Sequence, residues 1–264
     1  MLMKVSVIQL PVVIGDRQKN HDTLRTMLEK AMTEKPDTVL LPELWDIGFY
    51  PRPLENYTDE GAHSAKELLS ELSGKYHVNI VGGSVAAKLG DAVENICCVF
   101  DREGNCIADY SKSHLFSPAK EHKAFRAGDK VTVFTLDGVN CGVIICYDLR
   151  FPELTRRLAL SDIDILFIPA AWPTVRLAHW RLLAQARAVE NQFFVAAANG
   201  SGAFANGMPL AGHSAIIDPW GEILAEADEG SAIITADFDL SVKEKIRSTI
   251  NVFADRRPDL YRII

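Results

Sequence analysis

Short apolar segments alternate with amphipathic segments along nearly the whole chain. The apolar segments are rich in β-branched and aromatic residues and are bounded by Gly, Asn, Asp or Pro, which indicates strands. We expect these strands at residues 4–9, 38–41, 79–83, 95–101, 106–110, 131–135, 139–145, 165–168, 193–198, 213–217 and 232–238. Apolar residues at three- and four-residue spacing indicate helices, which we expect at residues 19–34, 61–76, 152–160, 177–191 and 241–250.

Two pairs of strands are close enough in the sequence to form hairpins. Residues 95–101 and 106–110 are joined by Arg-Glu-Gly-Asn, and residues 214–218 and 222–225 by Pro-Trp-Gly. Other strands are separated by helices, and this mixture predicts mixed sheets with helices on their outer faces. We therefore predict a single α/β domain over residues 1–264, with two stacked mixed sheets flanked by helices. The pattern leaves the strand order open.

Composition and charge exclude several classes of function. The hydrophobic fraction of 48% and the charged fraction of 24% are ordinary for a globular domain. The net charge of −7 provides no basic surface for nucleic acid or an anionic membrane. No apolar run approaches the roughly 20 residues that span a bilayer. We therefore expect neither a nucleic-acid partner nor a membrane partner.

The amino terminus and the cysteines favour a cytoplasmic protein. Residues 1–13 are apolar, but Lys4 and Pro11 interrupt them and no small-residue cleavage site follows. A buried first strand is therefore favoured over a signal peptide. The five cysteines are an odd number in a long chain, which makes a disulfide framework improbable and indicates a reducing compartment.

Three polar residues, Glu43, Lys112 and Cys146, each follow an expected strand directly or closely. Side chains at strand ends can converge in a crevice at the edge of a sheet. Cys146 is followed by a short turn and then by Pro152, which suits the first turn of a helix. Backbone N–H groups and the helix dipole can favour a thiolate at such a position. This context favours a nucleophile at Cys146.

Each of these three residues also has a simpler interpretation. Most cysteines are buried structural residues, and that description suits the other four, Cys97, Cys98, Cys106 and Cys141. Glu43 alone would be a surface carboxylate, and Lys112 alone a solvated cation. The base for a Cys146 thiol could be His114 or Glu43, since a carboxylate in an apolar crevice can take a proton near neutrality.

The segments LLPE around Glu43, YSKSHLF around Lys112 and CYDLRFPE around Cys146 closely resemble the three signatures of the nitrilase superfamily of carbon–nitrogen hydrolases. The resemblance covers essentially the whole chain. It includes RAVENQ at residues 187–192, AGHS at residues 211–214 and RRPDLY at residues 256–261.

This resemblance implies a four-layer αββα sandwich and a catalytic triad at Glu43, Lys112 and Cys146. It also implies a second glutamate at Glu121 and an oxyanion contact from the backbone N–H of Tyr147. The implied enzyme is a hydrolase of non-peptide carbon–nitrogen bonds that forms a cysteine thioester and releases ammonia and a carboxylic acid. Loss of a triad residue would have indicated a non-catalytic binding module, and no such loss is found.

The substrate is less well specified, because the family spans nitriles, primary amides and N-carbamoyl compounds. The chain looks most similar to the omega-amidases, which hydrolyse short 2-oxo dicarboxylic acid monoamides such as 2-oxoglutaramate. Arg150 matches the position that binds the distal carboxylate in that subgroup. The alternative is that Arg150 pairs with a structural acid, Asp148 or Glu153. An N-carbamoyl amino acid amidohydrolase and a nitrilase remain alternatives for the whole chain.

Further residues are expected to complete the pocket. We expect substrate contacts from His114, Trp172 and Arg176, and a loop lining the pocket near Phe204. That loop begins with Gly200-Ser-Gly-Ala-Phe-Ala, but Asn, Gly and Pro follow it, so it cannot open the helix that a dinucleotide fingerprint requires.

The sequence predicts neither a metal nor another cofactor, since it lacks both C-x-x-C and H-E-x-x-H spacings. The expected partners are a small amide substrate and further copies of the chain in a homodimer or higher homo-oligomer. By resemblance, the carboxy-terminal tail, about residues 250–264, packs across a subunit boundary.

Overall fold

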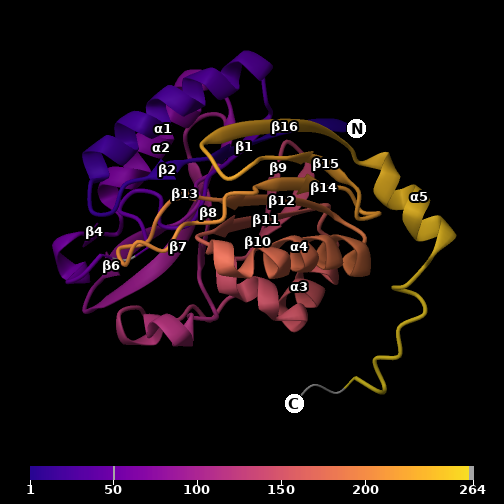
Figure 1. Ribbon diagram of the computed structural model, residues 1–264. Coiled ribbons are helices and arrows are strands. Elements are labelled where there is room, and N and C mark those ends of the chain that lie inside the picture. The colour runs from indigo at the N-terminus through magenta and orange to yellow at the C-terminus, as the bar shows by residue number, and fades with distance from the viewer. Residues whose placement is uncertain (50, 262–264) are drawn as a thin grey trace.

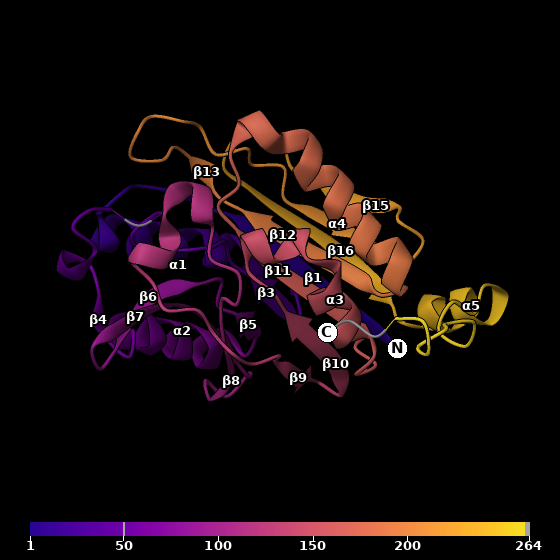
Figure 2. The same ribbon diagram turned by 90° about the horizontal axis from the view of Figure 1, so that it is seen from below.

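Two β-sheets lie face to face, with helices on both outer faces, in the computed structural model of the chain (Figure 1). The structure describes residues 1–49 and 51–261. Helices α1 (Arg17–Ala31) and α2 (His63–Tyr76) cover one sheet, and α3 (Pro152–Ala159) and α4 (Leu177–Asn191) cover the other. Figure 2 shows the same layers from a second direction. The predicted αββα sandwich is confirmed.

The first sheet has the strand order β16-β1-β3-β5-β7-β6-β4, and β8 pairs with β7. It is mixed, because β1, β3 and β5 run parallel while β16, β7 and β8 run antiparallel to their neighbours. Its strands are β1 (Leu2–Gln9), β3 (Thr38–Leu40), β4 (Asp59–Glu60), β5 (Asn79–Val81), β6 (Val85–Leu89), β7 (Ala92–Phe100), β8 (Cys106–Ser111) and β16 (Ala232–Asp239).

The second sheet has the order β15-β14-β12-β11-β10-β9, with β10, β11 and β12 parallel at its centre. Its strands are β9 (Val133–Leu136), β10 (Val139–Val143), β11 (Ile165–Ala170), β12 (Phe194–Asn199), β14 (Ala215–Ile217) and β15 (Ile223–Glu226). A small separate ladder joins β2 (Pro11–Val12) to β13 (Ser201–Gly202). Both predicted hairpins are present, as β7–β8 and β14–β15.

Some element boundaries differ from the sequence-based expectation. No strand was expected at β6, since its Ala-Ala-Lys sequence has low strand propensity; pairing with β7 overrides that propensity. The helix expected at residues 19–34 ends as α1 at Ala31, and a 3₁₀ turn, Met32–Glu34, completes it before Lys35 takes a φ of 52°. Such tightening is common where a helix ends.

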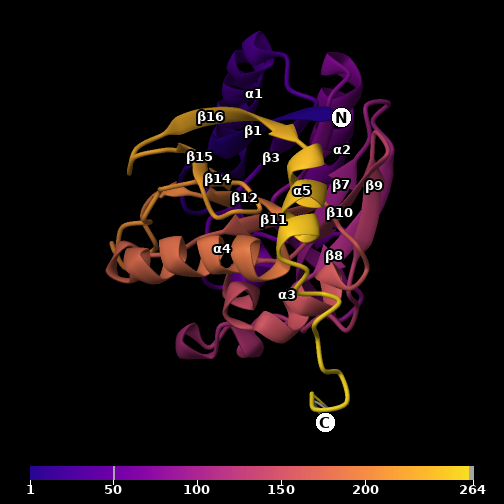
Figure 3. The same ribbon diagram turned by 90° about the vertical axis from the view of Figure 1, so that its right-hand side faces the viewer.

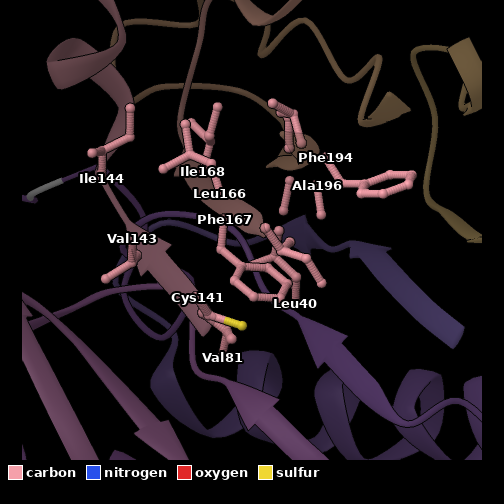
Figure 4. Close-up of a cluster of buried hydrophobic side chains, with 14 of the residues drawn as sticks. Leu40, Val81, Cys141, Val143, Ile144, Leu166, Phe167, Ile168, Phe194 and Ala196 are labelled. Carbon is pink, nitrogen blue, oxygen red and sulfur yellow. The ribbon is translucent and has the colours of Figure 1, made fainter. Parts of the chain in front are cut away.

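Alternation along each strand divides the core into layers. In β3, Leu40 faces the space between the sheets, while Val39 faces the helices α1 and α2. Figure 4 shows Leu40 and Val81 of the first sheet beside Cys141 and Phe167 of the second. These side chains are fully buried, so the interface between the sheets is a continuous apolar layer.

The helix α5 (Ser241–Thr249) lies beyond the end of the sheets (Figure 1), and the segment after it extends away from them (Figure 3). Phe253 in this segment packs against the guanidinium groups of Arg156 and Arg247, at 5.3 and 4.5 Å. Leu260 and Tyr261 are 67% and 50% exposed, so these two side chains have little contact with the rest of this chain.

Candidate active site

Glu43 directly follows Leu41 and Pro42, which come after β3 ends at Leu40, and it lies where the two sheets meet. Its backbone N–H donates to the carbonyl of Ala170 at the end of β11, at 3.3 Å. The carboxylate is buried, and its Oε2 accepts from the N–H of Ala171 at 2.9 Å. These contacts fix Glu43 at the seam between the sheets.

Lys112 follows β8, and its side chain is completely buried. Its Nζ donates to Glu43 Oε1 at 2.7 Å and to Glu121 Oε2 at 2.9 Å. Burial opposes the charge of this ammonium, but the two neighbouring carboxylates outweigh burial and hold the pKa of Lys112 well above its ordinary value. The lysine therefore remains a cation at neutral pH.

Glu121 begins a single 3₁₀ turn, Glu121–Lys123, in the loop after Lys112, and it is buried. Besides the bond to Lys112, its Oε2 accepts from the backbone N–H of Phe116 at 2.6 Å. The second glutamate implied by the family resemblance thus contacts the same ammonium as Glu43.

Asn95 on β7 is a residue of this site that the sequence analysis did not identify. Its Nδ2 donates to Glu43 Oε1 at 2.9 Å and to Glu121 Oε1 at 3.2 Å. One amide therefore bridges the two carboxylates. An asparagine at the start of the apolar run Ile96–Phe100 was the available signal, since a buried amide needs polar partners.

Cys146 lies at the sharp turn between β10 and a single 3₁₀ turn, Cys146–Arg150. Its φ of 47° is in the left-handed region, which costs a non-glycine residue on the order of 1–3 kcal/mol. Asp148 holds the turn, because its Oδ2 accepts from the N–H of Ile145 at 2.9 Å. Surrounding contacts thus impose the direction of the Cys146 side chain.

The environment of Cys146 favours the neutral thiol, contrary to the thiolate expected from a helix start. Burial raises the pKa of Cys146 well above its ordinary value, and the negative charge of Glu43 raises it further, while Lys112 opposes both. The 3₁₀ turn separates Cys146 from α3, which begins only at Pro152, so the helix dipole acts from farther away. A nucleophilic Cys146 therefore requires a base, and Glu43 is hydrogen-bonded to its thiol.

Cys146 and Tyr147 open onto a cavity of about 400 Å³. Aromatic side chains form much of its wall, namely Phe49, Phe116, Trp172 and Phe204. The loop that contains Phe204 was predicted to line the pocket, and it does so together with residues 205, 206 and 208. The cavity has the size and mostly apolar lining of a small-molecule site.

Two half-buried arginines, Arg150 and Arg176, also line the cavity. The Arg150 guanidinium lies 4.8 Å from the Trp172 ring and contacts His179 Nδ1 at 3.2 Å, and the Arg176 guanidinium lies 5.2 Å from the Phe116 ring. Within the described part of the chain, neither has a carboxylate partner. The alternative in which Arg150 pairs with a structural acid is therefore not what the structure shows.

His114 is placed away from the substrate contact that was expected for it. Its Nδ1 lies 2.7 Å from Asp148 Oδ1, and its ring stacks on Phe151 with 3.7 Å between the centroids. It does not line the cavity described above. Among the described residues, no hydrogen bond joins the His114 ring to Cys146; its Nδ1 is paired with Asp148 instead.

No group of three or more His, Cys, Asp or Glu side chains is arranged to hold a metal ion in residues 1–49 and 51–261. Over the same residues, no helix is long and apolar enough to cross a membrane.

The fold and this site are those of a hydrolase with a buried glutamate–lysine–cysteine arrangement. The family model for carbon–nitrogen hydrolases matches residues 4–248. The chain belongs to the carbon–nitrogen hydrolase family of the nitrilase superfamily, and it is an enzyme that cleaves carbon–nitrogen bonds in amides. This confirms the family resemblance seen in the sequence.

Three relatives illustrate the relationship. A 2-oxoglutaramate amidase from Bacillus subtilis is 41% identical, with 97% of this chain and 98% of that protein covered. The omega-amidase NIT2 of Homo sapiens is 32% identical, with 98% and 97% covered. The crystal structure of Nit3 from Saccharomyces cerevisiae, a member of branch 10 of the nitrilase superfamily, is 32% identical, with 97% of each chain covered and a TM-score of 0.90.

Proposed function

We propose that the protein is an omega-amidase that hydrolyses a short 2-oxo dicarboxylic acid monoamide, such as 2-oxoglutaramate, through a thioester on Cys146. The observation that carries this proposal is a buried base and ammonium beside Cys146, which lines a small cavity together with two arginines that have no acid partner among the described residues. The names of the Bacillus subtilis and Homo sapiens relatives support the same assignment.

The first half of the reaction makes the thioester. Glu43 takes the thiol proton as Cys146 sulfur attacks the amide carbon, and the electron pair of the carbonyl moves onto its oxygen. The Lys112 ammonium and the backbone N–H of Tyr147 stabilise this oxyanion; one such donor typically contributes about 3–4 kcal/mol to transition-state stabilisation. Glu43 then gives the proton to the departing nitrogen, so ammonia leaves and the acyl group remains on sulfur.

The second half of the reaction releases the acid. Glu43, again a carboxylate, takes a proton from a water molecule, whose oxygen attacks the thioester carbon. The tetrahedral intermediate collapses, the carbon–sulfur bond breaks, and the proton on Glu43 returns to the sulfur. Because one carboxylate serves both halves, its position must be fixed, and Asn95, Lys112 and Ala171 each donate a hydrogen bond to it.

The arginines are the basis for the choice of substrate. A guanidinium without an acid partner on a pocket wall is suited to a carboxylate, which it can bind through two parallel hydrogen bonds. The two arginines would bind the carboxylate and the neighbouring 2-oxo group, while the apolar rings of Phe116 and Trp172 hold the guanidinium planes in place. The amide at the other end of the substrate then reaches Cys146.

The test is a comparison of purified enzyme on three substrate classes. 2-Oxoglutaramate should release ammonia with the highest kcat/KM, compared with an N-carbamoyl amino acid and an aliphatic nitrile. Carbon dioxide accompanies ammonia only from the carbamoyl substrate, so its measurement separates the first two activities. A higher kcat/KM on the carbamoyl compound or on the nitrile would replace the omega-amidase assignment with the corresponding activity.

No step of this mechanism uses a metal, since side chains or the backbone supply every charged or polar group. Prolonged treatment with EDTA followed by gel filtration should therefore leave kcat unchanged. A rate that falls and recovers on addition of zinc or manganese would contradict the cofactor-free mechanism.

The protein is further proposed to form a homodimer or higher homo-oligomer. Large apolar side chains are exposed on α4 and on the neighbouring hairpin, including Leu182 at 66% and Trp220 at 51%. Exposed large apolar side chains on neighbouring elements support an interface at this surface. The tail from about residue 250, with Leu260 exposed, is proposed to pack on the second subunit, although residues 262–264 lie outside the described residues. Leu182→Glu should lower the mass measured by light scattering.

We also place the protein in the cytoplasm, as a single domain over residues 1–264. All five cysteines are free, and Cys97, Cys98 and Cys141 are buried within strands. A reducing compartment preserves the free thiol that the mechanism requires of Cys146. Cell fractionation followed by immunoblotting would test this location.

A further inference from the structure

Asp148 is a buried carboxylate that accepts four hydrogen bonds. Its Oδ2 accepts from the N–H of Ile145 at 2.9 Å and from the hydroxyl of Tyr110 at 2.8 Å. Its Oδ1 lies 2.8 Å from the backbone nitrogen and 2.7 Å from the Nδ1 of His114. Because an ionised carboxylate only accepts, each of these groups donates to it.

These donors come from two separate segments of the chain. Ile145 and Asp148 flank Cys146 on the second sheet, while Tyr110 and His114 flank Lys112, which follows β8 of the first sheet. Tyr110 also contacts Ser113 Oγ at 3.0 Å, within the same segment. Asp148 therefore ties the segment of the nucleophile to the segment of the ammonium.

Closing the nucleophile turn accounts for only one of the four contacts. The bond from Ile145 to Asp148 closes the turn around Cys146, together with the 3.0 Å bond from the Asp148 N–H to the Ile145 carbonyl. The three bonds from Tyr110 and His114 add nothing to that turn. These three bonds fix the position of the Cys146 turn relative to Lys112. They are explained if the reaction requires a set distance between the two segments.

The geometry of Cys146 explains why that spacing would be sensitive. A residue with a φ of 47° keeps this conformation only while its surroundings impose it. A displacement of about 1 Å between reacting groups can lower a rate by about a hundredfold. If the link to Lys112 were lost, the turn would be free to relax, and the oxyanion would form farther from the ammonium.

We propose that Asp148 is a positioning residue which, through Tyr110 and His114, holds the Cys146 sulfur at the correct distance from the Lys112 ammonium. This proposal rests on the proposed roles of Cys146 and Lys112. It also assigns His114 a role in orientation instead of the substrate contact expected from the sequence.

The test variants are Asp148→Asn, Tyr110→Phe, His114→Ala and His114→Asn. The matched control is Asp109→Asn, an exposed residue on β8 next to Tyr110. Active sites are counted by alkylation of Cys146 with iodoacetamide. All variants are made in a Cys106→Ser background, because Cys106 is exposed, and a hydrogen bond with Cys98 lowers the pKa of Cys106 to about 7. Only protein from the folded peak of gel filtration is labelled, and turnover is then expressed per labelled site, which removes any loss of folded protein.

Asp148→Asn should lower kcat per site by about ten- to a hundredfold, and Tyr110→Phe by about three- to tenfold, with KM within about threefold of the control. His114→Asn places an amide nitrogen close to the position of the imidazole Nδ1, so it should retain more activity than His114→Ala. If Asp148→Asn does not fold, Tyr110→Phe and the His114 pair decide the question.

Two results would overturn the proposal. The first is a kcat per site within twofold of that of Asp109→Asn for Tyr110→Phe and both His114 variants. The second is a His114→Ala variant with a higher KM and an unchanged kcat, which would indicate a substrate contact. Failure of the proposed function looks different: Cys146→Ala would then still release ammonia. An inactive Cys146→Ala alongside unaffected Tyr110 and His114 variants would overturn the positioning role alone.

Discussion

The charged cluster of Glu43, Asn95, Lys112 and Glu121 and the pair Arg150 and Arg176 use positive charge in opposite ways. In the cluster, two carboxylates surround one buried ammonium, so that charge is compensated within the protein. The arginines are half-buried, lie on aromatic rings and have no acid partner among the described residues. The first arrangement suits a reaction common to many amides, and the second suits recognition of an anionic part of one substrate.

Substitutions in the charged cluster and at the two arginines should also differ in their effect on the stability of the protein. Removing one partner from a buried pair leaves an uncompensated charge and typically destabilises a protein by about 3–5 kcal/mol. Changing a half-exposed arginine has a smaller effect on stability, because water solvates both states. Substitutions in the cluster should therefore affect turnover of every substrate and also the fold, whereas substitutions of the arginines should affect only substrates that carry the matching anion.

The largest effect is expected from the nucleophile itself. Cys146→Ala should lower turnover of every amide by about 10⁴-fold or more, because no other group can form the thioester. Circular dichroism should match that of the wild type, since the side chain loses only one atom. Substantial activity in a folded Cys146→Ala protein would show that the cluster serves another nucleophile.

Glu43→Gln comes next, with an expected loss of about 10²- to 10⁴-fold in kcat on charged and uncharged amides alike. An amide accepts no proton from Cys146 or from water, so thioester formation and hydrolysis should both slow in stopped-flow measurements. Glu121→Gln is the matched control, a similarly buried carboxylate that also accepts a hydrogen bond from Lys112. It should lower kcat less and leave alkylation of Cys146 intact, and equal losses in both variants would contradict separate roles.

Arg150→Met should lower kcat/KM for 2-oxoglutaramate by about ten- to a hundredfold, because a charge-assisted hydrogen bond is worth roughly 1.5–3 kcal/mol. Turnover of an uncharged short amide should barely change. Arg157→Met on the exposed face of α3 controls for loss of positive charge. Equal losses on both substrates would mean that Arg150 supports the Cys146 turn, and the assignment would return to an unspecified amidase.

The smallest expected effect is a slope in stability at high pH. The pKa of Lys112 is well above its ordinary value, so above about pH 10.4 the folded state binds more protons than the unfolded state. The contribution of Lys112 to the free energy of unfolding is complete below that pH and should fall by about 1.4 kcal/mol per pH unit above it. Urea titrations between pH 9 and 11 would measure this slope.

Lys112→Met should remove this part of the slope, whereas exposed Lys123→Met should not. Burial and the neighbouring Asp148 also raise the pKa of Tyr110. Ionisation of this tyrosine in the unfolded state therefore lowers the free energy of unfolding over the same pH range. Tyr110→Phe separates the two contributions. An identical slope in the wild type and Lys112→Met would contradict the electrostatic description of the cluster.

The sequence by itself determined the layers of the fold and predicted the residues of the proposed triad. Strands such as β3 and β5 are short apolar segments in which neighbouring residues face two different cores, so their hydrophobicity is visible without the fold. Glu43, Lys112 and Cys146 each follow a strand, within segments that resemble family signatures. Local composition and spacing contain this information because strand formation and turn residues are local properties.

Only the tertiary structure decided what those residues contact. Asn95 on β7 donates to both Glu43 and Glu121, and the His114 ring contacts Asp148, because pairing of β7 with β8 and stacking of the sheets bring distant positions together. The same is true of charge: burial and through-space neighbours raise the pKa of the Cys146 thiol, and the Arg150 guanidinium contacts His179 and no carboxylate among the described residues. Those quantities depend on distances between segments far apart in the chain, which no local pattern encodes.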